Sequence, residues 1–273
     1  MNNMFLSKED YEEPCCPLSK PNQATHIPIG RIIEKLDEYL SRNDYSASER
    51  YLKYWLAEAE ACCDDRGRLS VLNEQIGLYR KMGKMPEGLK AIDESIKLID
   101  SLNMENTITQ ATTFINVATG YKAFGRAKDA LPLYRKAQEI YESDLKPNDS
   151  RLGGLYNNLA LVLMELGDYK EARELFNKAF DIMSKQINGE TDMAITYCNL
   201  ADLVAQELGM VEGEKQIADY LLKAQKLLET KSLPRDGYYA FVCEKCAPTF
   251  GYYGYFLVEQ KLLKQAREIY ERN

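Results

Sequence analysis

Asparagines recur at one helical position in three successive segments of the chain. Asn116, Asn158 and Asn199 are separated by 42 and 41 positions, and Asn73 and Asn157 stand one residue before that position in their own segments. A side-chain amide carries both a donor and an acceptor, so a row of amides can bind the backbone of an extended peptide whatever its sequence. We therefore predict that these asparagines bind a peptide. The alternative is that each amide bonds a carbonyl of a neighbouring helix or loop.

Charged side chains follow on the same predicted helices. Arg80 and Lys122 are candidates to bind an acidic group of the ligand, and Glu165 and Asp202 would add charge selectivity. The alternative for each of them is a solvated charge at the surface, which contributes little binding energy.

Aromatic residues are concentrated in residues 238–256, where eight of nineteen side chains are Tyr or Phe. Most of these rings would fill the last core between helices. Tyr252 and Tyr255 lie off the apolar stripe, so we expect them to line the end of a binding groove. A homodimer contact through this aromatic end is the other functional interpretation.

The cysteines are seven in number and unevenly spread, which does not match the disulfide framework of a secreted protein. A thiol or zinc protein built on Cys15, Cys16, Cys243 and Cys246 is an alternative that the spacing leaves open. However, adjacent cysteines chelate one ion poorly, and the single histidine, His26, is distant in sequence. We interpret Cys243 and Cys246 as buried side chains one helical turn apart, and we expect no metal and no cofactor.

The composition limits the class of protein. The chain of 273 residues has a net charge of −7 and 45% hydrophobic residues, with a mean hydropathy of −0.44. The negative charge argues against nucleic acid or anionic lipid as a partner, and no apolar run reaches the ~18 residues of a membrane helix. No secretory signal is visible, so we expect a cytoplasmic location. No Ser/His/Asp set or phosphate-binding glycine loop can be assembled, and we predict that the chain is not an enzyme.

Helical periodicity begins near Gly30 and continues through the chain. Residues 1–28 contain four prolines and no sustained period. We therefore predict an N-terminal arm over residues 1–28, extended or partly disordered, and one repeat domain over residues 29–273.

Turn residues divide this domain into about six pairs of helices. Gly83, Gly125 and Gly167 are each 42 positions apart, with apolar helical faces on both sides of each glycine. A pair of short helices cannot bury its own apolar face, so the copies must stack on one another. Further turns are predicted at Asn43–Tyr45, at Gly209–Gly213 and near Lys261.

Two of the pairs resemble the tetratricopeptide repeat, TPR. Its pattern of large, small and aromatic residues around a glycine turn is matched by Tyr156, Leu159, Ala160, Leu163, Gly167, Ala172, Phe176 and Ala179. The same pattern recurs as Phe114, Val117, Ala118, Tyr121, Gly125, Ala130, Tyr134 and Ala137. The 42-residue period exceeds the ~34 of the commonest form, and residues 156–180 are similar to the repeats of kinesin light chains and related bacterial proteins.

This resemblance implies an all-α fold, an α-α superhelix or TPR solenoid of about six helical hairpins, whose first helices line a concave peptide-binding groove. In such repeats, and in peptide-sensing regulators of Gram-positive bacteria, asparagines at the place of Asn116, Asn158 and Asn199 bind ligand backbone. We predict a non-enzymatic scaffold for a protein or peptide partner. A peptide-responsive cytoplasmic signalling regulator is the alternative, although such regulators usually carry a further module ahead of the repeats, and 28 residues are too few to fold as one.

Overall fold

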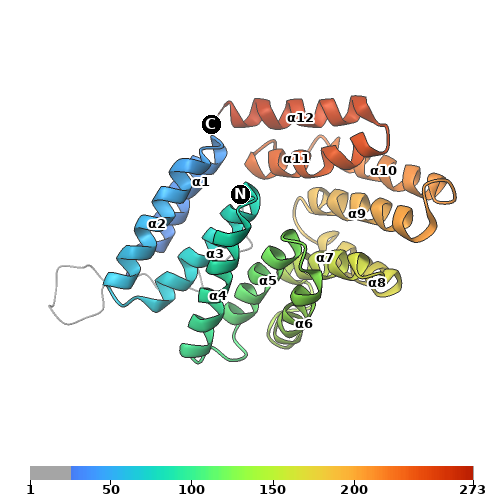
Figure 1. Cartoon of the computed structure of the whole chain (residues 1–273). Coiled ribbons are helices and arrows are strands. Elements are labelled where there is room, and N and C mark those ends of the chain that lie inside the picture. The colour runs from blue at the N-terminus through green and yellow to red at the C-terminus, as the bar shows by residue number, and fades with distance from the viewer. Residues whose placement is uncertain (1–25, 273) are drawn as a thin grey trace. The chain divides into compact units, whose positions relative to one another are not determined.

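The structure, a computed structural model, describes residues 26–272, and these residues form helices and turns without a strand (Figure 1). The helices within that range are α1 (Ile29–Ser41), α2 (Tyr45–Ala61), α3 (Asp65–Met82), α4 (Met85–Ser101), α5 (Ile108–Ala123), α6 (Ala127–Asp144), α7 (Ser150–Glu165), α8 (Tyr169–Met183), α9 (Glu190–Leu208), α10 (Glu214–Leu228), α11 (Gly237–Tyr252) and α12 (Phe256–Tyr270). Consecutive helices pair into six hairpins, so the predicted all-α fold of helical hairpins is confirmed.

The hairpins form two compact units that meet in sequence between Asp144 and Leu145. The first unit contains α1 to α6, and the second contains α7 to α12. Inside each unit the first helices of successive hairpins pack on one another, as α3 does on α5 and α9 on α11. The apolar face that a hairpin cannot cover alone is thus covered by its neighbour.

The two helices of a hairpin differ in how much of their surface is buried. Helix α7 buries eleven residues on several faces, whereas its partner α8 buries six along one stripe. A helix enclosed from several sides needs small residues where neighbours approach closely. A Cβ atom at Gly120 of α5, for example, would lie 2.9 Å from the side chains of both Ile76 and Ile92.

Glycines with left-handed backbone close the hairpin turns at a constant interval. Gly83, Gly125, Gly167 and Gly209 have φ values of 68°, 73°, 87° and 88°, and each is 42 positions after the one before it. Positive φ is strained for residues with a Cβ, which explains glycine at these places. The predicted register therefore extends one repeat further than the sequence pattern alone indicated.

The predicted last turn near Lys261 is wrong. Helix α11 ends at Tyr252, and the turn is made at Gly254, whose φ is 84°. Lys261 lies inside α12 and forms an ion pair of 2.6 Å with Glu229. Tyrosines flank Gly254 on both sides, so the apolar pattern does not change at the turn, and only the backbone of the glycine marks it.

Aspartates cap the amino ends of helices in both units. A side-chain oxygen accepts a backbone N–H at Asp44, Asp64, Asp149, Asp168 and Asp236. Asp64 does more, because its carboxylate also accepts the backbone N–H of Ile27 at 2.9 Å and contacts His26 Nδ1 at 3.0 Å. This carboxylate anchors the first described residues to the start of α3. Residues 1–25 of the predicted arm lie outside the described residues.

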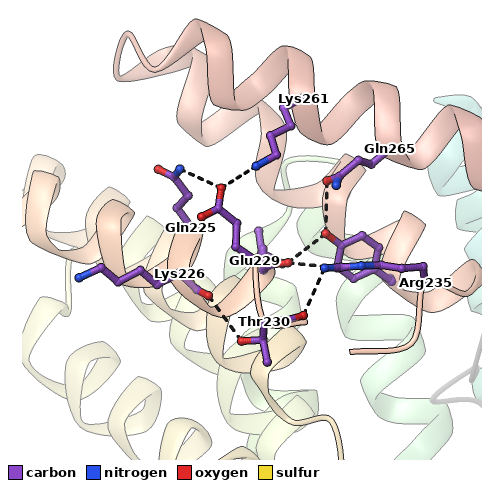
Figure 2. A network of polar contacts seen from close by, with 9 residues as sticks. Gln225, Lys226, Glu229, Thr230, Arg235, Lys261 and Gln265 are labelled. Atoms are coloured by element: carbon purple, nitrogen blue, oxygen red, sulfur yellow. Dashed lines mark hydrogen bonds and ion pairs between the residues drawn. The ribbon is translucent and has the colours of Figure 1, made fainter. Parts of the chain in front are cut away.

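A polar network stabilises the carboxyl end of α10 (Figure 2). The guanidinium of Arg235 donates to the carbonyls of Leu228 and Thr230 at 3.1 and 3.2 Å and lies 4.0 Å from the centre of the Tyr239 ring. The Tyr239 hydroxyl donates to the same Leu228 carbonyl at 3.0 Å. Carbonyls that the helix leaves without partners are bonded in this way, so the network is structural.

Two glycine substitutions test the role of the turns, and they should change stability in opposite directions. Gly125→Ala should destabilise the chain by about 1–2 kcal/mol, because positive φ strains an alanine although no atom blocks its Cβ. Gly77→Ala, inside α3 and equally free of neighbours, should stabilise it by up to ~1 kcal/mol. Denaturant unfolding measures both. Equal signs for the two variants would contradict this account of the turns.

Candidate functional site

Two of the predicted asparagines bind each other inside the first unit. Asn73 on α3 and Asn116 on α5 are both buried. Asn116 Nδ2 donates to Asn73 Oδ1 at 3.1 Å, and Asn73 Nδ2 donates to Thr113 Oγ1 at 3.1 Å. These amides connect one first helix to the next and are already occupied.

The second unit repeats this connection. Asn157 Nδ2 on α7 donates to Thr196 Oγ1 on α9 at 3.0 Å. Asn157 stands 84 positions after Asn73, and Thr196 stands 83 after Thr113, so the two bonds are equivalent. An asparagine one residue before the position shared by Asn116, Asn158 and Asn199 therefore links neighbouring first helices. This regularity is visible in the sequence once the repeats are aligned.

The asparagines at the shared position in the second unit, Asn158 and Asn199, are placed differently. Asn158 on α7 is half-buried. Asn199 on α9 is 9% exposed, and its Nδ2 atom has no hydrogen-bond partner within the described residues. A buried donor without a partner costs about 1–3 kcal/mol. Of the five predicted asparagines, Asn158 and Asn199 are thus the two whose amides take no part in these hydrogen bonds between first helices.

The charged candidates of the first unit lie on α3 and α5. Arg80 is exposed and Lys122 is half-buried. Surrounding protein desolvates the Arg80 guanidinium and lowers its pKa, while the nearby Tyr134 acts in the opposite direction. Because Arg80 is exposed, a ligand group can reach its guanidinium.

Two carboxyl groups that the sequence interpretation missed lie on α1 and α3. Glu74 is 8% exposed, and burial together with the charge of Asp37 raises its pKa to about 8. Burial also raises the pKa of Asp37, whose Oδ1 has no partner in the part of the chain that the structure describes. Glu74 precedes Asn116 by 42 positions. Alignment of the repeats could therefore have shown that Glu74 occupies the position that asparagine holds in the later repeats.

Carboxylates of α9 accept hydrogen bonds from Tyr238 of α11 and from Tyr253, which directly follows α11. The Tyr253 hydroxyl donates to Asp202 at 2.9 Å, and the Tyr238 hydroxyl donates to Asp192 at 2.5 Å. Burial raises the pKa of both carboxyl groups, and the tyrosine hydrogen bonds oppose that rise. The carboxylate of Asp202, which we predicted to add charge selectivity, is therefore partly buried.

The eight rings of the aromatic segment divide into five that lie in or against the core and three, Phe241, Tyr252 and Phe256, that are exposed, so the prediction that Tyr255 lies off the core is wrong. Tyr239 and Phe250 are buried, Tyr255 lies edge-on against Phe250 with ring centroids 6.2 Å apart, and Tyr252 is 73% exposed. Tyr252 and Tyr255 flank the last turn. Tyr252 is the most exposed ring of the segment, and a ligand or a second copy of the chain could contact it.

The thiols of the second unit lie in its core. Cys198, Cys243 and Cys246 are buried among apolar side chains, and burial raises the pKa of Cys243 to about 11. A raised pKa disfavours the thiolate that metals and oxidants need. Between residues 26 and 272 no group of three or more potential metal ligands occurs. Cys15 and Cys16 lie outside the described residues.

None of the helices within residues 26–272 has the length and apolar content needed to cross a lipid bilayer.

Comparisons with known proteins agree on one fold. The sequence profile of the tetratricopeptide repeat matches residues 67–143 and 151–211. The protein KINESIN LIGHT CHAIN-RELATED 2 of Arabidopsis thaliana is 23% identical over 162 residues, which are 58% of this chain and 23% of the relative. The chain thus spans about a quarter of the length of that curated relative.

Solved structures are similar at low identity. Kinesin light chain-like repeats from Podospora anserina share 18% identity with a TM-score of 0.52, over 74% of this chain and 94% of that one. NprR in complex with its cognate peptide NprX shares 14% identity with a TM-score of 0.58, over 87% of this chain and 66% of that one. At such identity the likeness shows the fold alone.

Substitution of Asn157 and of Asn158 tests whether the first amide stabilises the fold while the second remains available to a ligand. Asn157→Ala should destabilise the chain by about 1–3 kcal/mol, because it leaves the buried Thr196 hydroxyl with one partner fewer. Asn158→Ala should change stability by no more than ~0.5 kcal/mol. Chemical denaturation of both variants is the measurement, and equal losses would show that the two positions are not distinct.

Glu74 should make stability depend on pH. Its pKa in the folded chain, about 8, exceeds its ordinary value of 4.5, so the folded state holds the proton more tightly. The stabilisation is complete below the ordinary pKa and is lost as the pH rises through about 8. Glu74→Gln should remove this loss, which is on the order of a few kcal/mol. Unfolding curves between about pH 5 and pH 9 that are parallel for both proteins would contradict the assignment.

Proposed function

Because the chain belongs to the tetratricopeptide repeat family, we propose that it is a non-enzymatic scaffold that binds a protein or an extended peptide on its first helices. The observation that carries the proposal is the Asn199 amide, which is buried and has no partner within the described residues. An incoming peptide carbonyl would supply the missing acceptor. Asn158, at the equivalent place in the preceding repeat, offers a second amide on the same side of its helix.

The other predicted residues support this surface in different ways. Asn73, Asn116 and Asn157 hold the first helices at the spacing that the ligand meets. Arg80 and Lys122 in the first unit are placed to bind an acidic group of a ligand. Each of the two units has its own face of first helices.

Two further residues extend the proposed binding surface in the second unit. Asp202 supplies a carboxylate on α9, and Tyr252 supplies an exposed ring. Tyr255 holds the turn beside it. A homodimer through this aromatic end would use Tyr252 in place of a ligand contact.

The peptide form of the ligand is supported by analogy of fold. NprR, which has a similar fold, binds its cognate peptide NprX. A peptide-responsive regulator is therefore the second candidate function, and it would respond to the peptide by changing the curvature of its repeats. Small-angle scattering that detects compaction when peptide is added would distinguish it from a passive scaffold. The net charge of −7 argues against nucleic acid as the partner, and we place the binding in the cytoplasm.

Peptide capture by variants tests the proposal. The immobilised full chain should retain members of a randomised heptapeptide pool, detected by mass spectrometry. Asn158→Ala combined with Asn199→Ala should reduce that retention about tenfold or more, since each lost ligand hydrogen bond costs about 0.5–1.5 kcal/mol. Helical circular dichroism should not change.

The matched control is Asn177→Ala, an exposed asparagine of α8, which should retain peptides as the wild type does. Undiminished retention by the double variant would refute the proposed role of the amides. Absence of retention by the wild type would refute peptide binding itself.

A further inference from the structure

Asn199 and Asp202 are one turn apart on α9, in the second unit. Residues three apart on a helix are neighbours on its surface. Asn199 is nine-tenths buried and its Nδ2 lacks an acceptor among the described residues. A site with an unused donor of this kind is completed by a ligand acceptor at hydrogen-bond distance.

Asp202 lacks a cation. Its hydrogen-bond donor is the neutral hydroxyl of Tyr253, at 2.9 Å, and among the described residues no basic side chain acts on its charge. Burial instead raises its pKa. A partly buried carboxylate without a cation is destabilising, and the Tyr253 hydroxyl compensates its desolvation only in part.

Two other acidic residues of the same unit have cationic partners. Asp219 on α10 binds Lys223 at 2.7 Å, and Glu229 binds Lys261 at 2.6 Å. Asp192 on α9 differs from Asp202 as well, because the charge of Lys245 acts on it. Among these four acidic residues, Asp202 is the one on which no cation acts.

We propose that the pair formed by Asn199 and Asp202 binds a positively charged nitrogen that lies close to a peptide carbonyl. The carbonyl accepts from Asn199 Nδ2, and the nitrogen donates to the Asp202 carboxylate. A Lys or Arg residue of a bound peptide provides both groups, and so does a free peptide amino terminus. The inference rests on the proposed peptide-binding function and adds to it a preference of the second unit for basic ligands.

The geometry explains why the carboxylate is held where it is. The Tyr253 hydroxyl donates to Oδ1 of Asp202, and in this proposal the ligand nitrogen donates to Oδ2. Charge-assisted hydrogen bonds in a partly desolvated site are about twice as strong as neutral ones. The same carboxylate would repel an acidic ligand, so it selects by charge in both directions.

Peptide pools of defined charge test this proposal with the full chain. Acetylated heptapeptide pools carry Lys, Arg, Gln or Glu at the central position and are randomised elsewhere, and one more Gln pool has a free amino terminus. The wild type should retain the Lys and Arg pools about tenfold better than the acetylated Gln and Glu pools. Retention of the free Gln pool at the level of the Lys pool would show that the amino terminus supplies the cation.

Two variants complete the design. Asp202→Asn keeps an acceptor for Tyr253 but removes the charge, and it should bring all pools to equal retention. Asp181→Asn, an exposed residue of α8, should keep the tenfold preference. Unfolding midpoints of both variants report on their folding.

The outcomes separate this inference from the function on which it rests. Equal retention of all acetylated pools by the wild type, or a preference that survives in Asp202→Asn, would overturn the basic preference and leave peptide binding in place. Absence of retention for every pool would overturn both.

Discussion

The structure depends on one constraint: a hairpin of two short helices cannot cover its own apolar face. A first helix inside a unit is therefore enclosed by its partner and by neighbouring hairpins, as α9 is with ten buried residues. Small residues such as Gly120 allow the close approach, and glycine turns at a 42-residue interval keep the copies in register. A polar group buried on a first helix consequently lowers the stability of the fold unless it has a hydrogen-bond partner.

That cost explains why the polar residues of the first helices fall into two classes. Asn73 and Asn157 have buried partners on the next first helix and connect the hairpins within their units. The Asn199 amide lacks an acceptor within the described residues, and no cation acts on the Asp202 carboxylate. Burial of Glu74 raises the pKa of its carboxyl group to about 8, which favours the protonated form. The unsatisfied groups mark where stability has been given up, and such places in a scaffold are candidates for ligand contact.

The sequence predicted the fold better than the site. Gly83, Gly125 and Gly167 determine local backbone, so their spacing could be read directly, whereas Gly254 was hidden among tyrosines. The site was harder because Asn157 and Asn158 are adjacent and differ by a rotation of about 100° around the helix axis. Only the packing of α7 on α9 decides which of the two amides meets Thr196. The raised pKa of Glu74 likewise depends on Asp37, which is distant in sequence.

The central claim is that the amide of Asn199 meets a ligand while that of Asn157 holds the fold. Side-chain amide signals in proton–nitrogen correlation spectra report on both residues in one experiment, as a Lys-containing peptide selected by the chain is added. The account predicts that the Asn199 signal moves with peptide concentration while the Asn157 signal stays fixed. An Asn199 signal that does not move under saturating peptide, with shifts confined to the second helices, would contradict it.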